Sequence, residues 1–279
     1  MKLSEIAMRA PMILIAGQQG CGKTVQLLTY GSKGQLIDLD GGCQSGLRIV
    51  DTHTKRRHNI DVQRFVERQS TVATAFGKFE AHIRDIERQV SKGAWPFETL
   101  MIDSFTSLAE IAMRDALQAN GKLGQKERLK DWGDAFSVIK RSFFVLRSMQ
   151  IPVVCTAHMR PLTMTETVNG KEKQVTTWVV AIPGQTLPPA ILSFFDEILF
   201  MTLRKKGKNY VPVIRSMPTS TIPAKTRAGI PNNLELTMSM RKFVAMCDMR
   251  EDSPLKVTKK TKEIITKTPK KEKEANGNS

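Results

Sequence analysis

An eight-residue stretch near the start of the chain, GQQGCGKT, contains residue types that can bind a phosphate. Gly17 and Gly22 let backbone N–H groups turn toward phosphate oxygens without a clash from a Cβ atom. Lys23 can reach the terminal phosphates of a nucleotide, and the Thr24 hydroxyl can bind Mg²⁺. We therefore predict a loop that binds ATP and Mg²⁺. It consists of Gly17, Gln18, Gln19, Gly20, Cys21, Gly22, Lys23 and Thr24.

Two aspartates at the ends of apolar runs could complete the chemistry around this loop. Asp103 ends the run TLMID, where a carboxylate can hold Mg²⁺ opposite the loop threonine; the alternative is an ordinary turn residue. Asp40 lies in DLDGG, at the end of the strand next to the loop, where a carboxylate can activate the attacking water. An aspartate before two glycines is also a common turn residue, so both interpretations of Asp40 stay open.

The elements that must position these residues alternate between strands and helices. Short apolar runs predict buried strands, and apolar residues at steps of three and four predict amphipathic helices. The predicted strands cover 12–16, 35–39, 99–102 and 151–156, and the predicted helices cover 23–30, 72–90, 108–119 and 132–146. The alternation indicates an α/β fold, with a mostly parallel central sheet flanked by helices. Ligands of such sheets bind at the carboxyl ends of the strands.

The same rule places His158 at the phosphate site, because it ends the run VVCTAH. Its imidazole could sense the terminal phosphate, and a purely structural histidine is the alternative. Cys21 is interpreted as a small spacer, because the backbone supplies the contacts in such loops. The four cysteines show no metal-ligand spacing, which favours a reducing, cytoplasmic compartment. A secretory leader and a membrane-spanning segment are not expected from the apolar pattern.

The second half of the chain changes character. Asn169-Gly170 lies between alternating β-branched segments, which predicts a β-hairpin insertion over 162–180. Two further strands are predicted at 195–203 and 210–214, joined by the segment RKKGKN. Residues 251–279 are rich in Lys, Thr and Glu, which is typical of a disordered tail. We therefore predict one ATPase domain over 1–250 followed by a disordered Lys-rich tail.

The net charge of +16 indicates an anionic partner beyond the nucleotide, and nucleic acid is the commonest one. Residues 253–279 carry eight Lys and three Glu, so +11 of the charge lies outside the tail. Basic stretches occur at 55–57 and 204–208. The predicted DNA contacts are Arg160, Lys171, Lys173, Arg204, Lys205 and Lys206. Bases could stack on Trp178, or this side chain could pack the hairpin.

Together these motifs resemble a known family. The set GQQGCGKT, LIDLDGG, LMIDSFTSL, VVCTAH, FDEILFM and AKTRAGIP is similar to the RecA-like core. It looks more closely like the phage P-loop ATPases of the single-strand annealing, RecA-related group. The resemblance covers roughly residues 10–245. The phosphate loop and the Asp103 element alone are shared by many families, whereas the combination of DLDGG, DSFTSL, TAH and AKTR is more specific.

The resemblance implies roles for particular residues. It makes Asp40 the catalytic carboxylate, although RecA itself has the longer Glu there, and it matches His158 to a polar residue that is Gln in RecA. Lys225 and Arg227 in the AKTR motif would reach the γ-phosphate bound by a neighbouring subunit. The family further implies a homo-oligomeric ring or filament, single-stranded DNA along a basic surface, and a single-stranded-DNA-binding protein as an accessory partner. For a phage protein, the compartment would be the host cytoplasm.

The expected function is therefore an ATPase, stimulated by DNA, that binds single-stranded DNA and promotes strand annealing or recombination. Three alternatives stay open. A helicase or DNA-packaging motor would use the same ATPase core. A small-molecule kinase would need an Arg-rich lid, and the sequence shows none between the predicted strands. A nucleotide-gated binding module without hydrolysis is the third alternative, because Asp40 is shorter than the glutamate of RecA.

Overall fold

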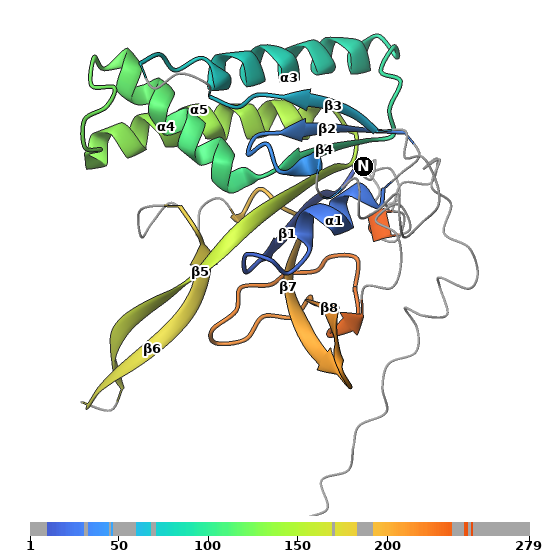
Figure 1. The fold of residues 1–279 in the computed structure, drawn as a ribbon, viewed down its shortest axis with the longest axis vertical. Coiled ribbons are helices and arrows are strands. Elements are labelled where there is room, and N and C mark those ends of the chain that lie inside the picture. Colours follow the sequence, from blue (N-terminus) through green and yellow to red (C-terminus); the bar gives the residue numbers. More distant parts are fainter. Residues whose placement is uncertain are drawn as a thin grey trace, which may run out of the picture.

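The computed structural model describes residues 10–30, 33–44, 46, 60–67, 71–168, 171–182, 192–235, 243, 244 and 247. It confirms the predicted RecA-like P-loop α/β fold, with a central, mostly parallel sheet and helices on both of its faces (Figure 1). The strands are β1 (Met12–Gly17), β2 (Gly34–Asp38), β3 (Ile60–Arg64), β4 (Thr99–Asp103), β5 (Val153–Val168), β6 (Lys171–Val180), β7 (Glu197–Lys206), β8 (Asn209–Arg215) and β9 (Leu234–Glu235). The helices are α1 (Lys23–Leu28), α3 (Ala75–Ser91), α4 (Phe105–Ala119) and α5 (Leu129–Ser148).

The strand order decides which residues can meet at the sheet edge. It runs β3-β2-β4-β5-β1-β7-β8-β9, and β6 pairs with β5 outside this path. All pairings from β3 to β7 are parallel, so the carboxyl ends of these strands lie along one edge. The position predicted for Asp40 was wrong in one respect. β4 and β5 separate its strand, β2, from the loop strand β1.

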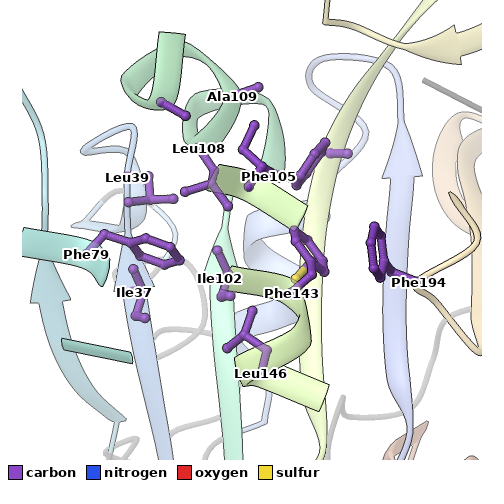
Figure 2. Packing of buried hydrophobic residues seen from close by; sticks show 14 of the residues in the cluster. Ile37, Leu39, Phe79, Ile102, Phe105, Leu108, Ala109, Phe143, Leu146 and Phe194 are labelled. Atoms are coloured by element: carbon purple, nitrogen blue, oxygen red, sulfur yellow. The ribbon is translucent and has the colours of Figure 1, made fainter. Parts of the chain in front are cut away.

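The sheet is held in place by apolar side chains on both faces. On one face, α3, α4 and α5 pack against the strands, and Phe105 and Phe143 lie together in this cluster (Figure 2). The centroid of the Phe143 ring lies 5.4 Å from that of Phe105 and 5.5 Å from that of Phe195. On the other face, Leu27 and Leu28 of α1 are fully buried in a second cluster. Burying one such side chain contributes about 1.5–3 kcal/mol, so this double burial fixes the strands that position the edge residues.

Two hairpins extend beyond the carboxyl edge of the sheet (Figure 1). β5 does not end at residue 156 but continues to Val168, so the predicted hairpin is an extension of a central strand. Its predicted turn at 169–170 lies outside the described residues. The segment predicted to join the next two strands is also largely strand, because β7 runs through Lys206 and β8 starts at Asn209.

Some predictions cannot be compared with the structure. The basic stretch 55–57 and the tail at 251–279 lie outside the described residues. Within the described part of the chain, none of the helices combines the length and the apolar character that crossing a bilayer requires.

Candidate nucleotide-binding site

The glycine-rich loop connects β1 directly to α1. A Cβ atom on Gly17 would lie 2.3 Å from the carbonyl oxygen of Met201 on β7, so the close approach of these strands requires glycine. Gly22 caps α1 with φ of 91°, a left-handed conformation that glycine adopts without strain. Residues 18–20 are exposed. The loop therefore has the backbone shape that the motif predicts, and its outer arc is open to solvent.

Lys23 lies at the centre of this loop and is only 5% exposed. Its Nζ donates hydrogen bonds to the carbonyl oxygens of Gly17, at 3.2 Å, and Gln18, at 2.8 Å. Burial lowers the pKa of the Lys23 ammonium, and the nearby negative charges of Asp103 and Asp40 act in the opposite direction. The loop thus holds one cation in a low-dielectric position, where its attraction for a phosphate is strengthened.

Asp103 joins the loop to the end of β4. Its Oδ2 accepts a hydrogen bond of 2.7 Å from the Thr24 hydroxyl, and its Oδ1 accepts one from the Thr156 hydroxyl on β5. The Asp103 side chain is nearly buried, at 2% exposure. A carboxylate beside a threonine hydroxyl is an oxygen donor set that suits Mg²⁺. These residues would hold the ion, which would neutralise phosphate charge. The role of Thr156 in orienting Asp103 was not predicted.

His158 lies beside Lys23, as the strand-end rule predicted. It pairs with Gly17 in the β1–β5 register, and its Nδ1 is 3.3 Å from Lys23 Nζ. Its backbone N–H donates to the Thr106 hydroxyl at 3.0 Å. Burial, and then the charge of Lys23, lower the pKa of His158, which favours the neutral ring. An unprotonated Nδ1 can accept a hydrogen bond from the ammonium, so the ring is coupled to the cation that is predicted to contact phosphate.

Asp40 lies on the exposed turn after β2. Partial loss of water around its carboxyl group and, second, the charge of Asp103 raise the pKa of Asp40 to about 6. A carboxylate with a raised pKa near neutral pH is better matched to accepting a proton from water. Asp40 therefore combines access to solvent with the proton affinity expected of a general base.

The turn that carries Asp40 is fixed by a buried aspartate, which pairs with an exposed arginine. Asp38 is fully buried, and its Oδ1 accepts a hydrogen bond of 2.8 Å from the backbone N–H of Gly41. Its Oδ2 accepts one of 2.9 Å from Arg64 Nε on β3. The anchoring role of this pair was not recognised from the sequence. The strand that carries Arg64, β3, has the mixed sequence IDVQR and lacks the apolar run of a buried strand. The signal available in the sequence was an aspartate three residues before Gly41, because Asp side chains often accept hydrogen bonds from the backbone of a following turn.

Lys225 and Arg227 lie near the opposite end of the sheet. Lys225 forms an isolated bridge with Ile198, which pairs with Leu14 of β1. Leu14 precedes Gly17 by three residues, or about 10 Å of strand. Lys225 Nζ donates to the Phe195 carbonyl at 2.8 Å, which draws it further from the loop. The structure therefore does not bring this pair to the phosphate loop of its own subunit.

The predicted DNA contacts occupy different environments. Arg204, Lys205 and Lys206 are exposed on β7. Arg160 is half-buried and lines a cavity of about 710 Å³ between α4 and the base of the β5–β6 hairpin. Lys171 and Lys173 lie on β6, but their side chains are outside the described part of the structure. Trp178 is half-buried, with its ring 5.8 Å from that of Phe200, which favours the packing interpretation over base stacking.

The fold and the loop together define the class of protein to which this chain belongs. A glycine-rich loop between a central parallel strand and a helix, with a buried lysine and a threonine bonded to a strand-end aspartate, is the site of a P-loop ATPase. A family model described as AAA domain, AAA_24, matches residues 9–228, and the chain belongs to this family. Among solved structures, it is similar to a KaiC-like protein from the hyperthermophilic archaeon Pyrococcus horikoshii OT3. The identity is 16% and the TM-score 0.41, covering 74% of this chain and 78% of that one. None of the curated proteins matches.

Exchanging each site aspartate for asparagine should separate binding from hydrolysis. Asp103→Asn removes a negative charge from the predicted Mg²⁺ position, so the affinity for Mg²⁺-ATP should fall. Asp40→Asn should leave that affinity nearly intact and slow hydrolysis by about 10²–10⁴-fold, because a general base acts on water. Nucleotide binding and turnover are measured for both variants, with exposed Asp134→Asn as the control. An equal loss of affinity in both variants would make Asp40 a metal-binding or structural residue.

Proposed function

We propose that this ATPase binds single-stranded DNA and uses the nucleotide cycle to promote annealing or recombination of complementary strands. One observation carries the proposal. Two hairpins extend past the carboxyl edge, on either side of the strand that leads into the phosphate loop (Figure 1). β5 contains His158 and then continues into the first hairpin, while β7 pairs with Gly17 and continues into the second. A change at the phosphate can therefore be transmitted along continuous strands to both hairpins.

The β7–β8 hairpin has the chemistry of a surface for single strands. Its exposed cations suit the phosphate backbone. Tyr210, which the sequence analysis did not single out, is 63% exposed and pairs across the strands with Lys205. An aromatic ring beside cations can stack on a base of any sequence, which contributes about 1–3 kcal/mol per base. The hairpin therefore suits a single-stranded nucleic acid with little sequence preference.

Assembly into a homo-oligomer is the second part of the proposal. Lys225 and Arg227 are separated by one residue in an irregular segment between Pro223 and Pro231. Their own phosphate loop lies near the other end of the sheet, and that loop already contains Lys23. We therefore assign both cations to the γ-phosphate bound by a neighbouring subunit in a ring or filament.

The DNA surface is tested by salt-dependent binding of a single-stranded oligonucleotide. The logarithm of affinity should fall linearly with the logarithm of salt concentration, with a slope of about −0.7 per phosphate contacted. Exchanging Arg204, Lys205 and Lys206 for alanine should make this slope shallower by about 2. Tyr210→Ala should weaken binding by about 1–3 kcal/mol with little change in slope, and Tyr210→Phe should retain binding.

The matched control removes three exposed cations at helix α3, namely Arg84, Arg88 and Lys92. This variant should bind as the unsubstituted protein does. Deleting residues 255–279 should weaken binding without abolishing it, because +11 of the net charge lies outside the tail. Loss of all binding in the truncated protein would show that the folded core is not the DNA surface.

A further inference from the structure

Glu197, the first residue of β7, is a buried carboxylate that the nucleotide site does not use. It is 2% exposed. Its Oε1 accepts two backbone hydrogen bonds, from the N–H of Arg227 at 2.8 Å and of Ala228 at 2.9 Å. Its Oε2 is buried and has no hydrogen-bond partner among the described residues. Burying a carboxylate with one unpaired oxygen is costly. The two hydrogen bonds that Oε1 accepts are therefore the contribution that explains a carboxylate at this position.

The neighbouring residues hold the same segment. Ile198 exchanges two backbone hydrogen bonds with Lys225, at 2.8 and 3.0 Å. Further along, the Ser216 hydroxyl donates to the Ile230 carbonyl at 2.6 Å, and the Ile230 N–H donates to the Thr226 hydroxyl at 3.0 Å. The backbone around Arg227 is thus fixed from several sides, and Glu197 provides the anchor at Arg227 itself.

The Arg227 guanidinium is held in a different way from its backbone. Its Nη1 donates to Asp196 Oδ1 at 2.8 Å, and the Arg227 side chain is 55% exposed. Asp196 itself is buried, but its carboxylate also accepts a hydrogen bond of 3.1 Å from the Met12 N–H and lies 3.7 Å from the Arg147 guanidinium. It therefore keeps these partners when a phosphate takes its place on Arg227. The backbone hydrogen bonds to Glu197 are buried and stay in place. Arg227 can therefore exchange its partner while the base of its side chain remains fixed.

We propose that Glu197 is a positioning residue for the phosphate contact made by Arg227 in the neighbouring subunit, an inference that rests on the proposed assembly. A single acceptor oxygen aligns two successive N–H groups and so sets the direction in which the Arg227 side chain leaves the backbone. A misplacement of about 1 Å in such a contact can cost about 10²-fold in rate. The negative charge of Glu197 is not required for this role, because a neutral carbonyl oxygen can accept both hydrogen bonds.

The test is complementation between inactive variants. Glu197→Ala should lower turnover by about 10²-fold, with nucleotide affinity retained because the loop is untouched. Mixed with Lys23→Ala subunits, it should regain activity, since those subunits supply an intact Arg227 to its intact loop. Mixed with Arg227→Ala subunits, Glu197→Ala should not regain activity, because neither variant supplies a correctly placed Arg227. Glu197→Gln should restore turnover relative to Glu197→Ala, and Asp134→Ala is the exposed acidic control.

The possible failures are distinguishable. If Glu197→Ala does not recover with Lys23→Ala despite co-assembly, or recovers with Arg227→Ala, the positioning role is wrong. If Glu197→Gln loses as much as Glu197→Ala, charge rather than hydrogen bonding matters, which also overturns the proposal. If Arg227→Ala itself does not recover with Lys23→Ala, the contact between subunits is wrong, and the fault lies in the proposed function.

Discussion

Replacing Lys23 with alanine is expected to abolish ATP turnover and to weaken ATP binding, with the fold retained. Lys23 Nζ is the buried cation at the centre of the loop, within 3.3 Å of His158 Nδ1. Removing one donor to a developing charge in an active site costs about 10²–10³-fold, and loss of a full positive charge should cost at least that. Turnover and nucleotide binding are measured side by side.

The matched control for this variant is Lys92→Ala, because Lys92 is exposed at the end of α3. It should keep full activity. The fold of the Lys23→Ala protein is checked by its thermal unfolding, because the variant loses the Nζ contacts to the carbonyls of Gly17 and Gln18 and to the side chains of Cys21 and His158. Unchanged turnover in a folded Lys23→Ala protein would contradict the assignment of the phosphate loop.

Arg227→Ala is expected to lower turnover by about 10³–10⁵-fold, the range known for arginines supplied in trans. The alternatives are a surface cation, whose loss should have little effect on turnover, and a contact to DNA phosphates, whose loss should weaken DNA binding. The decisive experiment mixes Arg227→Ala subunits with Lys23→Ala subunits, each inactive alone. In mixed assemblies, an intact Arg227 meets an intact loop, and activity should partly return.

Co-assembly must be shown independently, for example with two differently tagged subunits. Full recovery is not expected, because only a fraction of the interfaces pair the two intact residues. No recovery in confirmed mixed assemblies would contradict the contact between subunits and, with it, the ring or filament.

The parts of the site that depend on short sequence stretches were predictable. The phosphate loop is local, so its glycines, Lys23 and Thr24 could be identified before the fold was known. Asp103 and His158 were found because the carboxyl ends of parallel strands share one edge, and the register now places His158 opposite Gly17. The hydrogen bond between Thr24 and Asp103 joins residues far apart in the sequence, and the strand-end rule anticipated their approach.

Features that depend on tertiary pairing were not predictable in the same way. The strand order inserts β4 and β5 between β2 and β1, which no local pattern encodes. β3 was missed because its side chains are half-buried at the edge of the sheet, and with it the Arg64 partner of Asp38 was missed. The contact of Glu197 with the backbone of Arg227 joins residues 30 positions apart through an irregular segment, without a periodic signal.

The proposed coupling of the ATPase cycle to single-stranded DNA is tested by steady-state ATP turnover with and without a single-stranded oligonucleotide. We expect turnover to rise with oligonucleotide concentration and then to saturate. The rise should shrink when Arg204, Lys205 and Lys206 are replaced by alanine, with the basal rate serving as the internal reference. A turnover that is unaffected by DNA and increases only with a small phosphate acceptor would contradict this coupling and favour a small-molecule kinase.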